Sequence, residues 1–497
     1  MNYSYPIMTA DEAARLIKNG DVIGIGGFSS VGVPKAVPAA LARFAVEEHE
    51  AGRPFQIGLI TGGATGPAVD TDLAKAHAVK FRTPFQSNKD MRSAINSGEV
   101  QYFDCHLSMI GQDVHYGFLG KMDVAILEAS EITAEGNLIL STSVGIAPDL
   151  AAHADHLIIE LNSAHAGRLT GMHDIYLPEL PPYRKPFMIQ SPGDRIGTID
   201  LKIDPRKVLA VVETDLHDNQ AGFKPLDDDT RAIGAHVSEF LVSELKRGGI
   251  PKEFLPLQSG VGNVANAVIG ALGDNPDVPA FSMFTEVIQN SVVDLILKGR
   301  CNYVTGSSLS LTDDALKVMY DHMDVFGERV LLRSQEITNH PECIRRLGII
   351  ALNTALEADI FGNVNSTHVM GTKMMNGIGG SADFARNAYL SIFTTPSLAK
   401  GGAISSIVPM VTHVDSSEHS VRVLVTEQGV ADLRGKSPSQ RARLIIERCV
   451  HPDYKQLLWD YLRLSEGKGL HTPHSLRHAF AMHIAYEETG DMRNAKF

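Results

Sequence analysis

The stretch DVIGIGGFSSVGVPKAVPAAL (residues 21–41) combines a short apolar run, a glycine-rich turn and a helical pattern. A second stretch with the same plan is FLPLQSGVGNVANAVIGAL (residues 254–272), and Ala-Val and Ala-Leu pairs recur in both at an offset of 231 residues. Leu-Glu-Ala, Gly-Asn and Ser-Thr also recur in order between residues 127–145 and 356–371. Repeated matches at nearly one spacing predict two homologous halves.

A polar segment separates the predicted halves and places the domain boundary. It reads HDNQAGFKPLDDDTRAIGAHVSEFL (residues 217–241), and we expect domains at 1–225 and 226–497. In each half, apolar runs such as DVAILEA, HLIIELN, KVLAVVET, ISSIVPM and VRVLVTE alternate with helical segments. The alternation predicts an α/β fold of two open domains with mainly parallel sheets, and a site in the cleft between the domains.

Composition excludes several classes of partner. The 497 residues include 44% hydrophobic and 21% charged residues, which is typical of a globular protein. The net charge of -13 argues against nucleic acid as a partner. The four cysteines form no C-x-x-C pair, which favours a reduced, cytoplasmic setting. We predict neither a signal peptide nor a membrane span, because no run of 18 apolar residues occurs.

The stretch AFSMFTEVIQNSVVDLILKGR (residues 280–300) contains one carboxylate, Glu286, where an apolar run gives way to a helical pattern. An acid at a helix N-terminus is the ordinary explanation, because the helix dipole favours negative charge there. In the first half, Thr61-Gly62 of PFQIGLITGG aligns with Thr285-Glu286. The carboxylate is therefore present in one half only, which favours a functional role.

Three glycine-rich loops offer backbone N–H groups for binding. The loop GIGGFSSVG is an imperfect dinucleotide fingerprint, because Ser29 takes the place of the third glycine. A nicotinamide-dependent oxidoreductase is thus a remote alternative. The loops LQSGVGNVANAV (257–268) and MMNGIGGSADFARNA (374–388) are predicted to be tight turns that present N–H groups to a ligand oxygen, although glycine is also ordinary in turns.

Other catalytic patterns are incomplete. The chain has neither a G-x-S-x-G elbow nor an H-E-x-x-H pair. The C-terminal stretch HTPHSLRHAFAMH (471–483) places four histidines at near-helical intervals, but no carboxylate or cysteine completes a ligand set. We therefore predict no metal.

Several motifs together carry a family resemblance over nearly the whole chain. They are GGFSSVGVPKAVPAAL, LPLQSGVGNVANAV, FTEVIQ, IRRLGIIALN, EADIFGNVNSTHVMG, MMNGIGGSADFARNAYLSIF and VTEQGVADLRG. The chain resembles the acetyl-CoA hydrolase/transferase group of class I coenzyme A transferases, and within it the succinyl-CoA-dependent members. The resemblance implies two homologous α/β domains with the active site in the cleft between them. One departure is Ser416, where relatives often have histidine, and it leaves the role of that loop open.

The resemblance implies a role for each matching site residue. Glu286, in T-E-V-I-Q, matches the nucleophile that carries CoA, and the N–H groups of Val261 and Gly380 match the oxyanion hole. Asn339 and Glu427 match residues that position the carboxylate or the substrate, although an Asn turn and an acid at a strand end are ordinary readings. The matching CoA-binding positions are Gln258, Ser259, Gly260, Val261, Asn376, Gly380 and Lys400.

The expected activity is transfer of CoA between succinyl-CoA and a short carboxylate, propionate or acetate, with ping-pong kinetics. Coenzyme A is then a substrate, and we expect no tightly bound cofactor. The resemblance implies a homo-oligomer, a dimer. Arg333, Arg345 or Arg346 is expected to receive the distal carboxylate of succinate. An acyl-CoA hydrolase that uses the same glutamate, and a CoA sensor without catalysis, are the alternatives.

Overall fold

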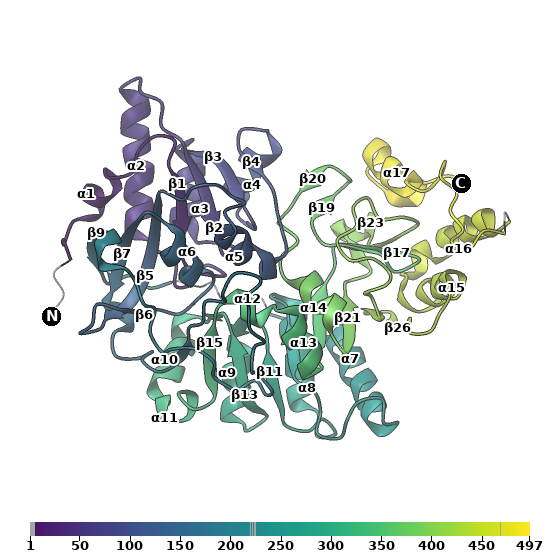
Figure 1. The fold of residues 1–497 in the computed structure, drawn as a ribbon. Coiled ribbons are helices and arrows are strands. Elements are labelled where there is room, and N and C mark those ends of the chain that lie inside the picture. Colours follow the sequence, from purple (N-terminus) through teal and green to yellow (C-terminus); the bar gives the residue numbers. More distant parts are fainter. Residues whose placement is uncertain (1–4, 219, 221, 223–224, 468) are drawn as a thin grey trace. The chain divides into compact units, whose positions relative to one another are not determined.

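The computed structural model describes residues 5–218, 220, 222, 225–467 and 469–497, which form two compact units (Figure 1). The described residues of Met1–Gly222, Ser282–Leu347 and Asn376–Asp383 form the first unit; those of Phe223–Phe281, Gly348–Met375 and Phe384–Phe497 form the second. The homologous domains at 1–225 and 226–497 stay a prediction, because these units follow contacts in space and are discontinuous in sequence. Residues 219, 221, 223 and 224 of the predicted linker lie outside the described residues.

The first unit is built on a parallel sheet in the order β4-β3-β2-β1-β5-β7-β9, with β6 antiparallel to β5. Its strands are β1 Val22–Ile25, β2 Ile57–Thr61, β3 Val79–Thr83, β4 Gln101–Tyr102, β5 Val124–Ile132, β6 Leu138–Leu140, β7 His156–Asn162 and β9 Val208–Thr214. The helices are α1 Ala10–Ala14, α2 Ala36–Glu50, α3 Pro67–Lys75, α4 Lys89–Asn96, α5 Leu107–His115 and α6 Ala147–His153. Every residue of β2 is buried, as expected of a parallel strand covered on both faces.

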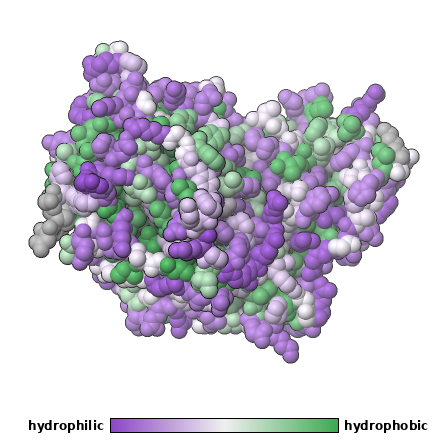
Figure 2. All heavy atoms as spheres, viewed as in Figure 1, coloured by the Kyte–Doolittle hydropathy of each residue, from purple (hydrophilic) through white to green (hydrophobic). Residues whose placement is uncertain are grey.

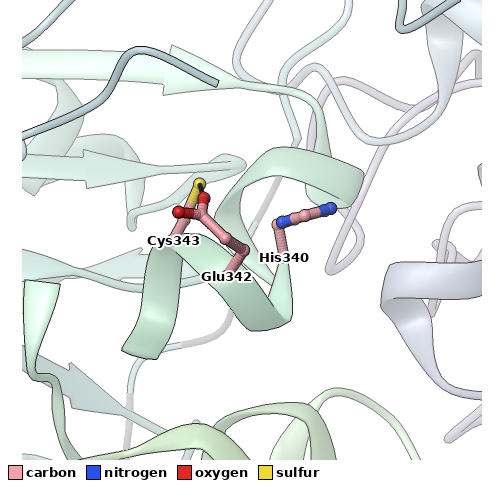
Figure 3. Close-up of side chains that lie close together, drawn as sticks. All are labelled: His340, Glu342 and Cys343. Atoms are coloured by element: carbon pink, nitrogen blue, oxygen red, sulfur yellow. Dashed lines mark hydrogen bonds between the residues drawn. The ribbon is translucent and has the colours of Figure 1, made fainter. Parts of the chain in front are cut away.

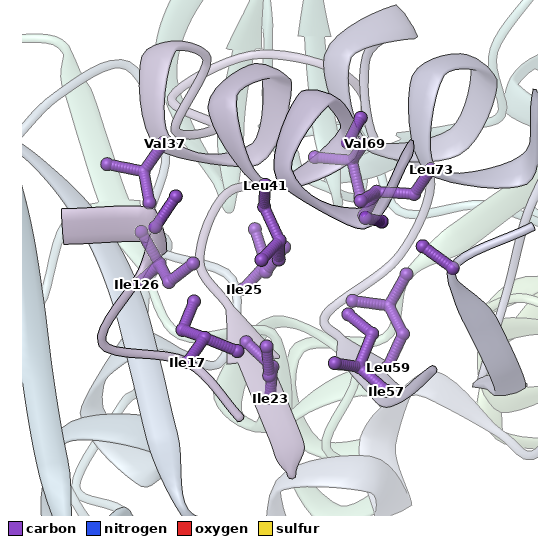
Figure 4. Close-up of a cluster of buried hydrophobic side chains, with 14 of the residues drawn as sticks. Ile17, Ile23, Ile25, Val37, Leu41, Ile57, Leu59, Val69, Leu73 and Ile126 are labelled. Atoms are coloured by element: carbon purple, nitrogen blue, oxygen red, sulfur yellow. The ribbon is translucent and has the colours of Figure 1, made fainter. Parts of the chain in front are cut away.

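Helices α2 and α3 cover one face of this sheet and form its core (Figure 4). Leu41 of α2 and Leu73 of α3 point toward Ile23 of β1 and Leu59 of β2 (Figure 4), and all four are fully buried. Full burial of such an aliphatic side chain contributes about 1.5–3 kcal/mol. The glycine-rich turn between β1 and α2 is thus fixed at both ends by packed elements.

The rest of the first unit comes mainly from residues 282–347. Strand β13 pairs in parallel with β15, β15 with β8, and β12 with β14. The strands are β8 His173–Asp174, β11 Phe281–Phe284, β12 Val287–Gln289, β13 Cys301–Gly306, β14 Ser308–Ser310 and β15 Val330–Arg333. The helices are α9 Asn290–Leu297, α10 Asp313–Asp321, α11 Met323–Phe326, α12 Gln335–Thr338 and α13 Pro341–Leu347.

The second unit contains parallel strands in the order β25-β21-β16-β10, with β26 antiparallel at the edge. They are β10 Leu257–Ser259, β16 Ile350–Thr354, β21 Leu390–Thr394, β25 Val423–Thr426 and β26 Gly429–Asp432. Short strands are β17 Glu357–Asp359, β18 Val364–Asn365, β19 His368–Val369, β20 Lys373–Met374, β22 Leu398–Ala399, β23 Ile404–Ser405 and β24 Ile407–Val408. The helices are α7 Asp228–Lys246, α8 Asn263–Asp274, α15 Pro438–Cys449, α16 Pro452–Glu466 and α17 Ala481–Thr489, and α14 Ser381–Asn387 begins in the first unit.

The predicted α/β class with mainly parallel sheets is confirmed. Strand, glycine-rich turn and helix follow one another at both β1–α2 and β10–α8, as the repeated stretches predict. The predicted strand ISSIVPM is wrong in part, because it divides into β23 and β24, which belong to different small sheets.

The face in Figure 2 is mostly hydrophilic, with apolar residues scattered over it. Among the described residues, none of the helices combines the length and the apolar character that a membrane crossing requires.

Candidate functional site

Glu286 lies in a short link between two strands. Strand β11 ends at Phe284 and β12 begins at Val287, whereas helix α9 begins only at Asn290. The carbonyl oxygen of Glu286 accepts hydrogen bonds from the N–H groups of Ser307 at 2.6 Å and Ser308 at 3.2 Å. The reading of Glu286 as an acid at a helix N-terminus is therefore wrong, and the backbone of the link is held by the segment after β13.

The side chain of Asn339 faces the Glu286 carboxylate. Asn339 caps the C-terminus of α12 and is fully buried. Its amide oxygen accepts a hydrogen bond of 2.9 Å from the Thr338 hydroxyl, and its amide nitrogen donates to Glu286 Oε1. The Asn339 amide nitrogen lies toward two carboxylates, those of Glu286 and Asp383, so Asn339 presents a donor to Glu286.

The carboxyl group of Glu286 has an unusual proton affinity. Burial is the main cause that raises its pKa to about 7, and the charge of nearby Asp383 raises it further, while the hydrogen bond from Asn339 opposes the shift. Because its surroundings destabilise the ionised form, this carboxylate is more basic than that of an ordinary glutamate. It is suited to act as a nucleophile near neutral pH.

Gly380 approaches the same carboxylate closely. A Cβ atom at this position would overlap Glu286 Oε1 and the Asn339 amide nitrogen. The preceding residues are fixed within the first unit, because Ile378 N donates to Asp104 Oδ2 at 2.7 Å and Leu107 N donates to Gly379 O at 3.3 Å. Only glycine leaves space for the carboxylate here.

Gly62, the counterpart of Glu286 in the first half, has no space around it for a side chain. A Cβ atom at Gly62 would lie 2.7 Å from the amide oxygen of Gln335 and 3.3 Å from Gly27 O. The Gln335 amide nitrogen also donates to Gly62 O at 2.9 Å. A glutamate would not fit there without displacing Gln335, which gives a physical reason for the difference between the two halves.

The structure thus brings together three of the predicted catalytic residues, Glu286, Asn339 and Gly380. Of the predicted CoA-binding residues, Asn376 begins the loop that carries Gly380. Its amide oxygen is buried and has no hydrogen-bond partner among the described residues. An orphaned buried acceptor is costly and suits a position that a ligand donor completes.

The other predicted CoA residues lie in the second unit. Gln258 and Asn353 exchange two amide hydrogen bonds of 3.2 Å, and Gly260 N donates to Leu352 O at 2.9 Å. Ser259 Oγ donates to Gly260 O at 3.3 Å, while the Val261 side chain is half exposed in the turn before α8. These contacts hold the turn, and their approach to Glu286 stays a prediction.

Lys400 and Glu427 also belong to the second unit. Lys400 is exposed, and its ammonium has no ion-pair partner in the part of the chain that the structure describes. The Glu427 carboxylate accepts from Ser397 N at 2.8 Å, from the Ser397 hydroxyl and from Gln428 Nε2 at 2.9 Å. Burial raises the pKa of Glu427, but these donors outweigh it and lower the pKa overall.

Two of the arginines expected to bind a distal carboxylate already have protein partners. The buried Arg333 guanidinium donates to Asp174 Oδ2 at 2.6 Å and to Pro192 O at 3.3 Å. Arg346 donates to Glu342 Oε1 at 2.7 Å and to Phe187 O at 2.8 Å. Neither guanidinium is available as placed, and the role of Arg345 stays a prediction.

The histidine-rich C-terminal stretch does not form one helical face. Helix α17 begins at Ala481, so His471, His474 and His478 precede it. His474 contacts the Tyr461 hydroxyl at 2.9 Å, and His483 contacts Glu357 Oε2 at 2.9 Å. These histidines therefore do not share one face of a helix.

His340, Glu342 and Cys343 lie close together at the start of α13 (Figure 3). Their donor set does not fit a metal ion, because the Arg346 cation already pairs with Glu342. Burial raises the pKa of the Cys343 thiol to about 12. The prediction that the reaction requires no metal stays a prediction.

Asp383 and Ser108 complete the surroundings of Glu286, and the sequence motifs did not indicate either residue. Ser108 donates to Asp383 from its N–H at 3.0 Å and from its hydroxyl at 2.7 Å. Asn339 Nδ2 lies 3.4 Å from Asp383 Oδ2. The only signal in the sequence is that Asp383 follows Gly380 by three residues.

The chain matches two family models, the acetyl-CoA hydrolase/transferase N-terminal domain over residues 1–213 and the C-terminal domain over residues 316–462. It is 49% identical to propanoyl-CoA:succinate CoA transferase of Escherichia coli over 99% of this chain and 100% of the relative. It is 47% identical to succinyl-CoA:acetate CoA-transferase of Clostridium kluyveri over 98% of this chain and 90% of the relative.

An acetyl-CoA hydrolase of Schizosaccharomyces pombe is 43% identical over 96% of this chain and 94% of the relative. Among solved structures, RipA from Yersinia pestis superposes with a TM-score of 0.70 at 22% identity, covering 92% of this chain and 96% of that chain. The last similarity supports the fold alone.

Proposed function

Because the chain belongs to the acetyl-CoA hydrolase/transferase family, we propose that it is an acyl-CoA:carboxylate CoA-transferase that moves CoA between succinyl-CoA and propionate or acetate. The observation that carries the proposal is the Glu286 carboxylate, which receives a hydrogen bond from Asn339 and has a pKa raised to about 7. Relatives named as CoA-transferases, at 49% and 47% identity, support the transfer of CoA to a second acid.

The reaction proceeds through covalent intermediates on Glu286. An ionised Glu286 oxygen attacks the thioester carbonyl, a new C–O bond forms, and the C–S bond breaks to release CoA thiolate and leave an acyl-glutamyl anhydride. The thiolate then attacks the glutamyl carbonyl, which releases the first acid and gives a glutamyl-CoA thioester. A second carboxylate reverses both steps. The thioester energy is retained, so no ATP is consumed and the kinetics are ping-pong.

Each step passes through a tetrahedral oxyanion, which requires hydrogen-bond donors. The N–H groups of Gly380 and Val261 serve this role, and Asn339 orients the carboxylate. Loss of one such donor typically slows catalysis about 100- to 1,000-fold. Glu427 positions the bound substrate.

Coenzyme A binds as a substrate along Gln258, Ser259, Gly260 and Asn376, and the Lys400 ammonium pairs with a phosphate oxygen. The protein needs neither a metal nor a tightly bound cofactor. It acts as a cytoplasmic homodimer.

A hydrolase with the same glutamate is the second candidate, because a relative named as an acetyl-CoA hydrolase matches at 43% identity. The two activities differ in whether water can reach the glutamyl thioester. A transferase excludes water and releases the bound CoA only to a carboxylate acceptor.

The test is intact-protein mass spectrometry after mixing the enzyme with succinyl-CoA, with peptide mapping, followed by addition of acetate or propionate. We expect a CoA-sized adduct on the Glu286 peptide that disappears as acetyl-CoA or propionyl-CoA forms. Rapid release of CoA without an acceptor would favour the hydrolase. The absence of both adduct and turnover would overturn the proposal.

A further inference from the structure

Asp383 is a buried carboxylate that contacts the same Asn339 amide nitrogen as Glu286 does. It is 6% exposed and lies in the first turn of α14. Its Oδ2 accepts from Ser108 N at 3.0 Å and from Asn339 Nδ2 at 3.4 Å, and its Oδ1 accepts from the Ser108 hydroxyl at 2.7 Å. The Asn339 amide nitrogen therefore has two acceptors, the carboxylates of Glu286 and Asp383, for its two hydrogens.

We propose that Asp383 is a positioning residue: it fixes the Asn339 amide against Glu286, and its negative charge disfavours the free Glu286 carboxylate relative to the uncharged anhydride and thioester formed on Glu286. This inference rests on the proposed function. It assigns to Ser108 the role of holding the Asp383 carboxylate in place.

The electrostatic part follows from the charge that each intermediate carries. Glu286 attacks in its ionised form and is neutral once it is acylated or carries CoA. A second carboxylate close by raises the free energy of the ionised form only, so it favours the covalent intermediates. Burial raises the pKa of Asp383 itself, whereas the hydrogen bonds from Ser108 and Asn339 and the nearby His106 lower it. His106 Nδ1 lies 3.8 Å from Asp383 Oδ1, and Cys105 also interacts with Asp383. Burial raises the pKa of that thiol to about 12, so it stays neutral.

The positional part follows from the elements that hold Asp383. Ser108 stands at the start of α5, and the neighbouring Leu107 N donates to Gly379 O at 3.3 Å. Helix α5 therefore holds both ends of the segment between Gly379 and Asp383. Movement of this segment would shift Gly380 and the Asn339 amide together.

Asp383→Asn separates charge from shape. An asparagine oxygen in place of Oδ2 can still accept from Ser108 N and Asn339, and its amide nitrogen can donate to the Ser108 hydroxyl. The network is kept while one negative charge is lost. The control is Asp113→Asn, which removes a charge from a partly buried carboxylate on the same helix as Ser108.

The experiment measures two quantities in the full-length wild-type, Asp383→Asn and Asp113→Asn proteins. They are the pH dependence of kcat/KM with succinyl-CoA and acetate, and the ratio of glutamyl-CoA thioester to free enzyme by intact mass. For Asp383→Asn we expect the acidic limb to move about one pH unit lower and the thioester ratio to fall about tenfold, because one pKa unit corresponds to a factor of ten. For Asp113→Asn we expect neither change.

The inference is overturned if the wild-type enzyme forms an adduct but Asp383→Asn shows the same pH dependence of kcat/KM and the same thioester ratio as Asp113→Asn. The proposed function stands in that case. If the wild-type enzyme forms no adduct, the proposed function fails and the inference fails with it. Ser108→Ala is a second variant that keeps the charge and removes one donor to Asp383. We expect its kcat to fall about tenfold with KM unchanged, because Asp383 loses a hydrogen bond made to a charged group. An unchanged kcat would contradict the positional role.

Discussion

The Asn339 amide nitrogen donates to the Glu286 carboxylate, although the two residues are separated by 53 positions in the chain. Asn339 also receives a hydrogen bond from the Thr338 hydroxyl, and the backbone of Glu286 is held by Ser307 and Ser308. The chain itself therefore supplies a hydrogen-bond donor aimed at the Glu286 carboxylate. Donors that the surrounding protein holds in place need little reorganisation during a reaction.

Glu286→Ala removes the nucleophile, and we expect transfer activity to fall to background while the affinity for CoA stays measurable. Without a carboxylate, neither the anhydride nor the thioester can form. The measurement is steady-state transfer from succinyl-CoA to acetate, with CoA binding by calorimetry. Glu328→Gln is the control, because Glu328 is an exposed carboxylate in the same unit and its loss should leave activity unchanged. Substantial transfer by Glu286→Ala would disprove the assignment of the nucleophile.

The rate should depend on the ionisation of Glu286. Its pKa is raised to about 7, mainly by burial, and only the ionised form attacks the thioester. We expect kcat/KM to rise with pH, with an apparent midpoint near 7, and to level off above it. The measurement is kcat/KM with succinyl-CoA from pH 5 to 9. A midpoint near 4.5, the ordinary value for glutamate, would show that burial does not act on this group.

The same shift makes a prediction about stability. Since the pKa of Glu286 is raised in the folded state, the folded protein gains stability from the neutral form at low pH and loses it as the pH rises through about 7. Glu286→Gln keeps the shape and cannot ionise. We expect it to be more stable than the wild type at pH 8, by at most about 3 kcal/mol, and nearly equal at pH 4.5. Thermal unfolding at both pH values measures the difference, and equal Tm differences at the two would contradict it.

Gly380→Ala should reduce transfer at least 100-fold, because the added Cβ would overlap the Glu286 carboxylate and the Asn339 amide. Gly270→Ala in α8 is the matched control, since a Cβ there meets nothing within 4 Å. We expect Gly270→Ala to raise the free energy of unfolding by about 1 kcal/mol and to leave activity unchanged. Kinetics and thermal unfolding of both variants make the comparison. A fully active Gly380→Ala enzyme would show that the loop does not approach Glu286 this closely in solution.

Asp70→Ala tests the core of the first unit. Asp70 and Arg82 are both fully buried, with Arg82 Nε donating to Asp70 Oδ1 at 3.1 Å. Removal of the carboxylate leaves a buried cation, which typically costs about 3–5 kcal/mol. Asp11→Ala breaks the exposed contact with Arg43 and should cost less than about 1 kcal/mol. Urea unfolding measures both, and similar losses would contradict the role of burial.

Much of the fold and part of the site could be predicted from the sequence. Apolar runs set the strands, and glycine-rich turns marked the starts of α2 and α8, because these signals are local. Glu286, Asn339 and Gly380 were indicated by motifs, and the structure brings them together. Asp383 and Ser108 were missed, because they are 275 positions apart and a serine or an aspartate alone carries no spacing signal.

Other expectations failed for physical reasons that sequence patterns do not contain. The histidines of residues 471–483 have helical spacing, but most of them precede α17. Arg333 looked like a free cation, yet Asp174 neutralises it within the core. Partners that are distant in sequence decide whether a charged side chain is available, and one sequence alone does not identify them.

The discontinuity of the first unit constrains how the protein is made. Its segment Asn376–Asp383 is synthesised more than 150 residues after Gly222, with two segments of the second unit between them. Domains usually fold as they leave the ribosome, N-terminal first. Here the nascent first unit must wait for the loop that carries Gly380 and Asp383. The surroundings of Glu286 are therefore completed late in translation, and a chain released before residue 376 carries Glu286 and Asn339 without Gly380 and Asp383.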